Sequence, residues 1–146
     1  MNQDLFNVIK ITASLDPVAK TASFVSTGIA VAGYESATAY VYLGTAAANS
    51  LASGKKWVFT LEECATDTDG SYTTVATADI IGAAANSLTV DATTEDNLIY
   101  AIGYKGTLEY IRVRCAATGS PGSTPMAIFF ALGNARHATT GQTAFA

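Results

Sequence analysis

The stretch LIYAIGYKGTLEYIRVRCA, residues 98–116, decides the fold class. Its second half alternates two sets of side chains, one apolar and one polar and cationic: Ile111, Val113 and Cys115 against Tyr110, Arg112 and Arg114. A period of two is typical of a β-strand with one buried face. The first half, residues 98–104, is mostly apolar on both faces, which favours a central position in a sheet. We therefore predict a hairpin of two strands with a tight turn at residues 105–107.

Other segments carry the same strand signals, separated by turns rich in Gly, Asp and Pro. Trp57, Phe59 and Leu61 share one face of the segment 57–64 and are core candidates, and this segment is expected to form a hairpin that returns through residues 72–77. The run MAIFFAL, residues 126–132, is wholly apolar and predicts a strand buried on both faces. About seven or eight short strands and no long amphipathic helix predict an all-β fold, an antiparallel β-sandwich or jelly roll.

A chain of 146 residues is expected to form one folded domain. Residues 28–133 carry the strand signals and should form the sandwich. Residues 1–27 are predicted to be an extended N-terminal arm that turns at Asp16-Pro17, because Pro donates no hydrogen bond and restricts the residue before it. The arm lies either on its own sandwich or on a neighbouring molecule. Residues 134–146 are predicted to be a C-terminal tail.

The composition narrows the classes of partner. Charged residues make up 14% of the chain, against about 25% in an average protein. The protein therefore either has a surface that is partly covered by partners or is a monomer coated with Thr, Ser and Ala. The net charge of −4 and the lack of a basic run argue against nucleic-acid binding. We expect no signal peptide and no membrane span. Cys64 and Cys115 are expected to be buried, reduced thiols, as in a protein made in the cytoplasm.

The residues that usually carry chemistry are sparse in this sequence. Its one histidine, His137, falls in the predicted tail, which would not hold a catalytic base in place. Asp67, Asp69 and Ser71 have the spacing that opens a calcium loop, but Ala78 stands where the bidentate Glu would be needed. We therefore interpret residues 67–70 as a hairpin turn, and predict no catalytic activity, no cofactor and no metal site.

The side chains that we expect at an interface are aromatic or cationic. Tyr40 and Tyr42 share one face of the predicted strand 37–43, and Tyr brings a large contact area at low entropic cost. Tyr110, Arg112 and Arg114 form the polar face of the strand in residues 110–116. A different hypothesis is a carbohydrate-binding module in which Trp57 joins Tyr40 and Tyr42 in an aromatic platform.

Five short motifs occur in a fixed order: AGYESA at 32–37, LEE at 61–63, GYKG at 103–106, YIRV at 110–113 and ALGNARH at 131–137. This ordered set resembles a group of small structural proteins of tailed bacteriophages and prophages, over residues 14–137. Two departures are Leu108-Glu109, where that group usually has a basic pair, and Asn134-Ala135, where it tends to have His-Pro. The first departure removes positive charge near the turn at residues 105–107.

The resemblance implies a virion protein, in particular a capsid decoration or cement protein that sits on the capsid surface. Its partner would be the major capsid protein, and such proteins often form trimers. Another place in the virion, such as a head-fibre base or the tail, remains an alternative. The resemblance carries over no contact residue, because its motifs are interpreted as structural.

Overall fold

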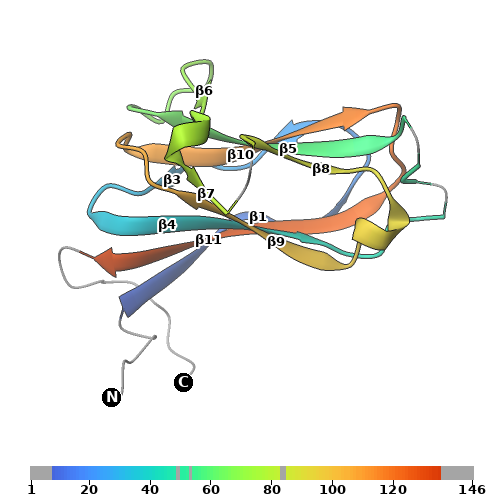
Figure 1. The fold of residues 1–146 in the computed structure, drawn as a ribbon, viewed down its shortest axis with the longest axis horizontal. Coiled ribbons are helices and arrows are strands. Elements are labelled where there is room, and N and C mark those ends of the chain that lie inside the picture. Colours follow the sequence, from blue (N-terminus) through green and yellow to red (C-terminus); the bar gives the residue numbers. More distant parts are fainter. Residues whose placement is uncertain (1–7, 49, 53, 83–84, 136–146) are drawn as a thin grey trace.

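The computed structural model of this protein describes residues 8–48, 50–52, 54–82 and 85–135 (Figure 1). Within them two antiparallel sheets pack face to face, so the predicted all-β sandwich is confirmed. Sheet A has the order β1 (Ile9–Lys20), β11 (Thr124–Ala135), β4 (Tyr34–Leu43), β9 (Leu98–Tyr104), β7 (Ile80–Ile81). Sheet B has the order β2 (Phe24–Val25), β10 (Tyr110–Thr118), β5 (Lys56–Cys64), β6 (Thr73–Thr74), with β3 (Ile29–Ala30) beside β10 and β8 (Ser87–Val90) beside β5.

Two short 3-10 helices complete the described elements, η1 (Thr77–Asp79) and η2 (Thr93–Glu95). Neither is long enough to cross a membrane, and the described residues contain no longer helix. Glu95 secures the start of η2, because its carboxylate accepts hydrogen bonds from the backbone N–H groups of Asp91 and Ala92 at 2.9 and 3.2 Å. Both helices lie in connections between strands, so the sandwich is built from the sheets alone.

The core lies between the two sheets. Trp57, Phe59 and Leu61 on β5 are fully buried, which confirms the core face predicted for that segment. The facing side chains of sheet A are apolar and buried in the same cluster, among them Val41, Leu43, Met126, Ile128, Phe130 and Leu132. The indole Nε1 of Trp57 donates a hydrogen bond to Thr124 Oγ1 at 3.1 Å and so joins the two layers. Burial of this apolar surface is the main stabilising contribution to the fold.

The predicted hairpin over residues 98–116 is wrong. Its two strands exist, but β9 pairs in sheet A and β10 pairs in sheet B, so residues 105–109 cross between the layers. Tyr104 spans the gap at this point, because its hydroxyl donates to Glu63 of sheet B at 2.7 Å and accepts from the Leu108 N–H at 3.0 Å. Gly106 passes directly over the Tyr104 ring, where an added Cβ would lie only 2.5 Å from ring atoms. A side chain at position 106 would therefore require the Tyr104 ring or the crossing to shift.

Residues 9–20 of the predicted arm form β1, an edge strand of sheet A paired with β11. The strand continues past Asp16-Pro17 through two register shifts, after Ala13 and after Leu15. A proline is tolerated here because an edge strand has one side without ladder hydrogen bonds. Residues 9–20 thus lie on their own sandwich, which is one of the two alternatives left open by the sequence.

A buried polar link holds β1 to the opposite sheet. Ser14, at the first bulge, donates to the Thr27 carbonyl at 2.6 Å, and its Oγ lies within hydrogen-bond distance of Ser26 Oγ, at 2.7 Å. Ser26 Oγ in turn accepts the backbone N–H of Val113 on β10 at 3.0 Å. Ser14 and Ser26 are both buried, so these hydrogen bonds satisfy groups that water cannot reach.

Three further strand predictions need correction. β11 is buried only on its inner face, because the side chains from Ala127 to Ala131 that point the other way are half-buried. The first half of the opening stretch, β9, is not central, because its outer neighbour β7 has only two residues. The hairpin predicted from Trp57 is also shorter than expected: β6 pairs only with Glu62 and Glu63, and β8 covers the first half of β5. Burial in the middle of a sheet therefore does not explain why the outer faces of β9 and β11 are apolar.

Of the predicted C-terminal tail, Asn134 and Ala135 belong to the end of β11. The remaining residues 136–146, with His137, lie outside the described residues, as do residues 1–7 at the other end.

Candidate interaction surfaces

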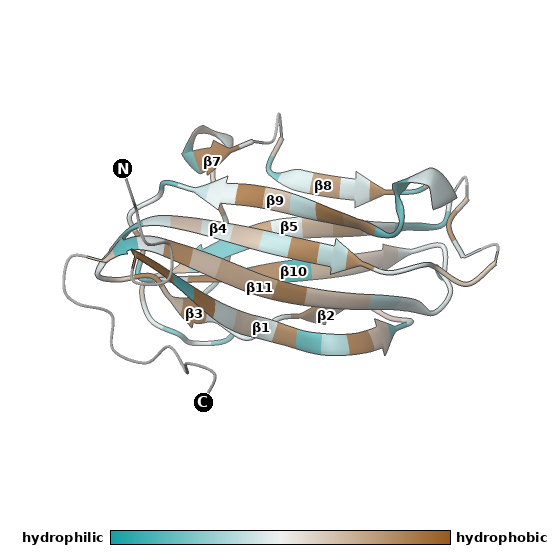
Figure 2. Ribbon diagram, turned by 90° about the horizontal axis from the view of Figure 1, so that it is seen from below, coloured by the Kyte–Doolittle hydropathy of each residue, from teal (hydrophilic) through white to brown (hydrophobic). Residues whose placement is uncertain are grey.

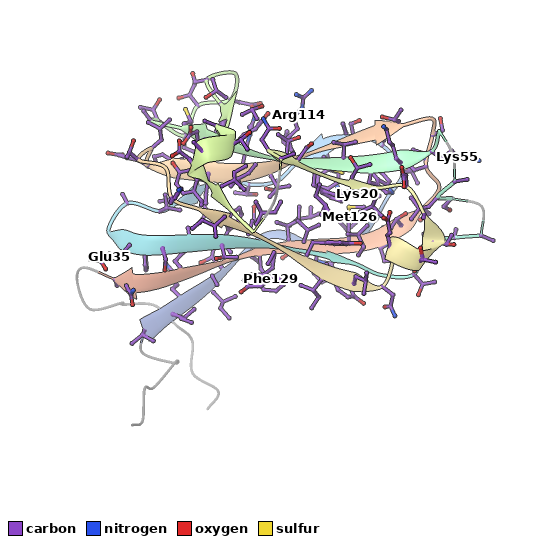
Figure 3. The ribbon with its side chains drawn as sticks, viewed as in Figure 1. Lys20, Glu35, Lys55, Arg114, Met126 and Phe129 are labelled. Atoms are coloured by element: carbon purple, nitrogen blue, oxygen red, sulfur yellow. The ribbon has the colours of Figure 1, made fainter. Side chains whose placement is uncertain are left out.

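The five predicted interface residues lie on opposite sides of the sandwich. Tyr40 and Tyr42 project from β4 on the outer face of sheet A, whereas Tyr110, Arg112 and Arg114 project from β10 on the outer face of sheet B. Figure 3 shows this separation: Phe129 of β11 lies on the outer side of sheet A, Met126 lies between the layers, and Arg114 projects beyond sheet B. The five residues therefore cannot contribute to one contact surface, and each face is considered by itself.

The outer face of sheet A carries no charged side chain at the positions where residues pair regularly between neighbouring strands. We define this face by the residues that pair across the sheet and point away from sheet B: Ile9, Ile11, Ala13, Ser36, Thr38, Tyr40, Tyr42, Ile81, Ile99, Ala101, Gly103, Ala127, Phe129, Ala131 and Gly133. Figure 2 views this side of the molecule, with β5 and β10 behind. Asp16 lies in the second bulge of β1, outside that register.

Several large apolar side chains on this face are open to solvent. Ile11 and Ile99 are each 60% exposed, Ile81 is 56% exposed and Tyr42 is 37% exposed. At the centre of the face, the rings of Tyr40 and Phe129 stack 5.1 Å apart with an interplanar angle of 10°. An exposed apolar patch of this kind marks a contact surface more often than a bare surface.

The outer face of sheet B is polar, and Arg112 stands at its centre. The guanidinium donates from Nε to Glu62 at 2.8 Å and from Nη1 to Asp69 at 2.7 Å, and it lies 3.9 Å from the centre of the Tyr72 ring. The side chains of Arg112 and Glu62 are only 12% and 7% exposed. The hydrogen bond and charge of Arg112 hold the pKa of Asp69 below its usual value. Arg112 is thus engaged within its own chain.

Arg114 and Tyr110 remain as outward-facing groups on the same strand. The Arg114 side chain is 61% exposed, and its Nη1 lies 4.0 Å from Glu62 Oε1. Such a long, solvated contact contributes little to stability. Tyr110 is half-buried at the start of β10. Of the three residues predicted on this face, Arg114 is the one most accessible to a partner.

The Asp-rich turn uses its carboxylates within the chain. Asp67 accepts the Tyr72 hydroxyl at 2.6 Å and Asp69 accepts Arg112 at 2.7 Å, while Gly70 has a positive φ of 91°. Burial, and then the hydrogen bond to Asp67, raise the pKa of Tyr72. In the part of the chain that the structure describes, no cluster of three His, Cys, Asp or Glu has a metal-binding arrangement. These contacts agree with the interpretation of residues 67–70 as a turn.

The other predicted residues have structural positions. Cys64 and Cys115 are both free and buried, and burial raises the pKa of the Cys115 thiol. Trp57 is fully buried between the sheets and cannot join Tyr40 and Tyr42 in an aromatic platform. Gly103 lies under Ile81, where a Cβ would come within 3.0 Å of the Ile81 Cβ.

Sequence reasoning found the two tyrosines of the sheet A face but missed Ile11, Ile81, Ile99 and Phe129. These residues come from four strands that are far apart in the chain and meet only through the pairing of sheet A. The available signal was the apolar outer side of residues 98–104 and 126–132, which was interpreted as burial on both faces.

Comparison with known proteins gives one informative likeness. No protein-family model matches the chain, and no curated protein matches it significantly. Among solved structures, the chain is similar to the PBSX exported protein XepA, with a TM-score of 0.53 and 17% sequence identity. The likeness covers 100% of this chain and 46% of that one, so this chain spans about half the length of XepA. The chain therefore shares its fold with part of the PBSX exported protein XepA.

Proposed function

We propose that this protein is a structural component of a phage particle, a capsid decoration protein that binds the assembled shell and stabilises it without catalysing a reaction. The observation that carries the proposal is the uncharged outer face of sheet A, with Ile11, Ile99 and Ile81 more than half exposed. A face of this composition is suited to burial against protein, in this proposal against other copies within the decoration layer.

Two other findings support a phage particle as the setting. The fold is shared with part of XepA, a phage-related protein. The ordered motifs of this sequence resemble those of small structural proteins of tailed phages, and the structure gives them structural positions: Gly33 has a positive φ of 89° in the turn before β4, and Gly106 passes over Tyr104. A cleft of about 510 Å³ lies between the turn at Gly33 and the crossing at Gly106, at one end of the sandwich.

The mechanism would depend on multivalent contact. A single decoration subunit makes a modest contact with the major capsid protein, but a homo-oligomer that bridges neighbouring capsid subunits gains avidity through effective concentration. The sheet A face serves assembly of the decoration layer, and the polar face of sheet B, where Arg114 is 61% exposed, faces the shell. In this arrangement the two faces of the sandwich have different partners.

The test is binding to bare capsids. Purified protein is mixed with capsids that lack it, and co-sedimentation and the temperature of capsid rupture are measured. We expect saturable binding and a higher rupture temperature, and Arg114→Ala should weaken binding without changing the unfolding temperature of the free protein. Thr89→Ala, at the exposed position of β8 in the same sheet, is the matched control, because it removes no charge. Absence of both binding and stabilisation would refute the proposal.

A further inference from the structure

The outer face of sheet A is corrugated in two neighbouring rows. The first row crosses the strands through directly paired residues: Ile11, Ala131, Thr38, Gly103 and Ile81. The second row, two residues further along each strand, is formed in the same way: Ala13, Phe129, Tyr40 and Ala101. Residues two apart on a strand point to the same side, so the two rows lie side by side on one surface.

The two rows have opposite profiles. In the first row, small side chains occupy the middle and isoleucines stand at both ends, which makes a trough. In the second row, the stacked rings of Tyr40 and Phe129 occupy the middle and alanines stand at both ends, which makes a ridge. We call these rows the trough and the ridge.

A two-fold axis that runs parallel to the rows, midway between them, makes this surface complementary to itself. The rotation places each trough residue opposite the ridge residue of the same strand in a second copy. Phe129 then meets Ala131, Tyr40 meets Thr38, and Ile11 meets Ala13, so a large side chain faces a small one at each of these positions. An isologous contact of this kind is the commonest form of homodimer.

We propose that the outer face of sheet A binds a second copy of this chain as a two-fold dimer, with the ridge of each copy in the trough of the other. The face has no charge in its regular register, so pairing two copies brings no like charges together, although each chain carries a net charge of −4. Two aligned sheets that pack through such faces form the same kind of layer contact as a β-sandwich core.

The available area is compatible with a stable dimer. Four long strands spaced about 4.8 Å apart, each of about ten residues rising about 3.3 Å, give a flat footprint of about 600 Å². The accessible area of a corrugated surface exceeds its flat footprint, and a standard interface needs about 800 Å² from each partner. The dimer would also cover Ile11, Tyr42 and Ile99, which are exposed in the single chain.

The test is the mass of the purified full-length protein at micromolar concentration, measured by sedimentation equilibrium. We expect twice the chain mass of 15.1 kDa. Thr38→Lys, in the trough, should reduce the mass to one chain, whereas Thr89→Lys, on sheet B, makes the same change of charge and should leave the dimer intact. Circular dichroism confirms that each variant is folded.

A second variant separates fitted packing from general stickiness. Thr38→Trp adds apolar area but fills the trough, so it should weaken the dimer about tenfold or more. A face that associates only because it is apolar would bind more tightly with the added tryptophan. A wild-type mass of one or three chains, or a Thr38→Trp dimer tighter than wild type, would overturn the two-fold pairing.

This inference rests on the proposed function only in using the same face for assembly. A protein that is monomeric yet sediments with capsids would refute the dimer alone. A dimer that neither binds nor stabilises capsids would refute the decoration role alone.

Discussion

Replacement of Arg112 by methionine tests whether this residue stabilises the fold or serves as a contact residue. The guanidinium is held by Glu62 at 2.8 Å and Asp69 at 2.7 Å, and it covers the Tyr72 ring. Glu62 is the partner that matters most, because its side chain is 7% exposed whereas that of Asp69 is 86% exposed. Methionine keeps much of the length and the apolar stem of the side chain but leaves the Glu62 carboxylate without its nearest cation.

The expected loss is large for a single substitution. Removing one partner of a buried ion pair costs about 3–5 kcal/mol, because the remaining charge stays in a poorly hydrated site. The exposed contact with Asp69 adds less than about 1 kcal/mol. For a chain of this size, about 1 kcal/mol corresponds to about 2–4 °C in the unfolding temperature, so Arg112→Met should lower it by about 6–20 °C.

The assay is reversible unfolding in urea, with thermal unfolding as a second measurement. Arg114→Met is the matched control, because Arg114 is 61% exposed and 4.0 Å from the same carboxylate, and it should cost less than about 1 kcal/mol. Adding Glu62→Gln to Arg112→Met removes the unpaired charge and should recover part of the loss. The reasoning is refuted if Arg112→Met unfolds within about 1 kcal/mol of wild type, or if the second substitution recovers nothing.

Three further substitutions or conditions test the cross-layer contacts. Ser26→Ala leaves the buried N–H of Val113 without its side-chain acceptor and should cost about 1–3 kcal/mol in urea unfolding; an unchanged midpoint would contradict this. Gly106→Ala forces a Cβ against the Tyr104 ring and should destabilise the folded protein by about 1–3 kcal/mol in the same urea measurement. No effect is expected if the crossing at residues 105–109 is a loose turn. Burial, and then the hydrogen bond to Glu63, raise the pKa of Tyr104, so its contribution to stability is complete below about pH 10 and is lost as the pH rises through the folded pKa. The unfolding temperature should therefore fall above about pH 10, and fall less in Tyr104→Phe; equal slopes would argue against this hydrogen bond.

The sequence was sufficient for the class of fold and for much of the core. Alternation along residues 57–61 and 111–115 placed Trp57, Phe59, Leu61, Ile111 and Val113 on buried faces, and the structure buries all five. These are local signals, because a strand with one buried face carries its own period of two whatever its partners are.

The connections between strands were harder to predict. The residues around Gly106 have the composition of a hairpin turn, but β9 and β10 belong to different sheets. A turn within a sheet and a crossing between sheets can use the same residues, because both must reverse the chain in a few positions. Likewise, Asp16-Pro17 indicated a break, whereas the edge position of β1 accommodates it as a bulge.

The outer face of sheet A could be predicted only in part. Tyr40 and Tyr42 are neighbours on one strand, so their shared side follows from the sequence. Ile11, Ile81 and Ile99 join them through pairings between segments that are distant in the chain. An apolar face that lacks a covering layer also has the same sequence pattern as a buried one, which is why residues 126–132 were predicted to be buried on both faces.

The most direct test of the central claim is hydroxyl-radical footprinting of the protein bound to capsids, with the unfolded chain as the reference for reactivity. Ile11, Tyr42 and Ile99 are 60%, 37% and 60% exposed in the single chain, and we expect them to lie in a protein interface. All three side chains should therefore react far less than these exposures would allow. Reactivity in proportion to those exposures would show that the outer face of sheet A stays open to water, and would contradict the account.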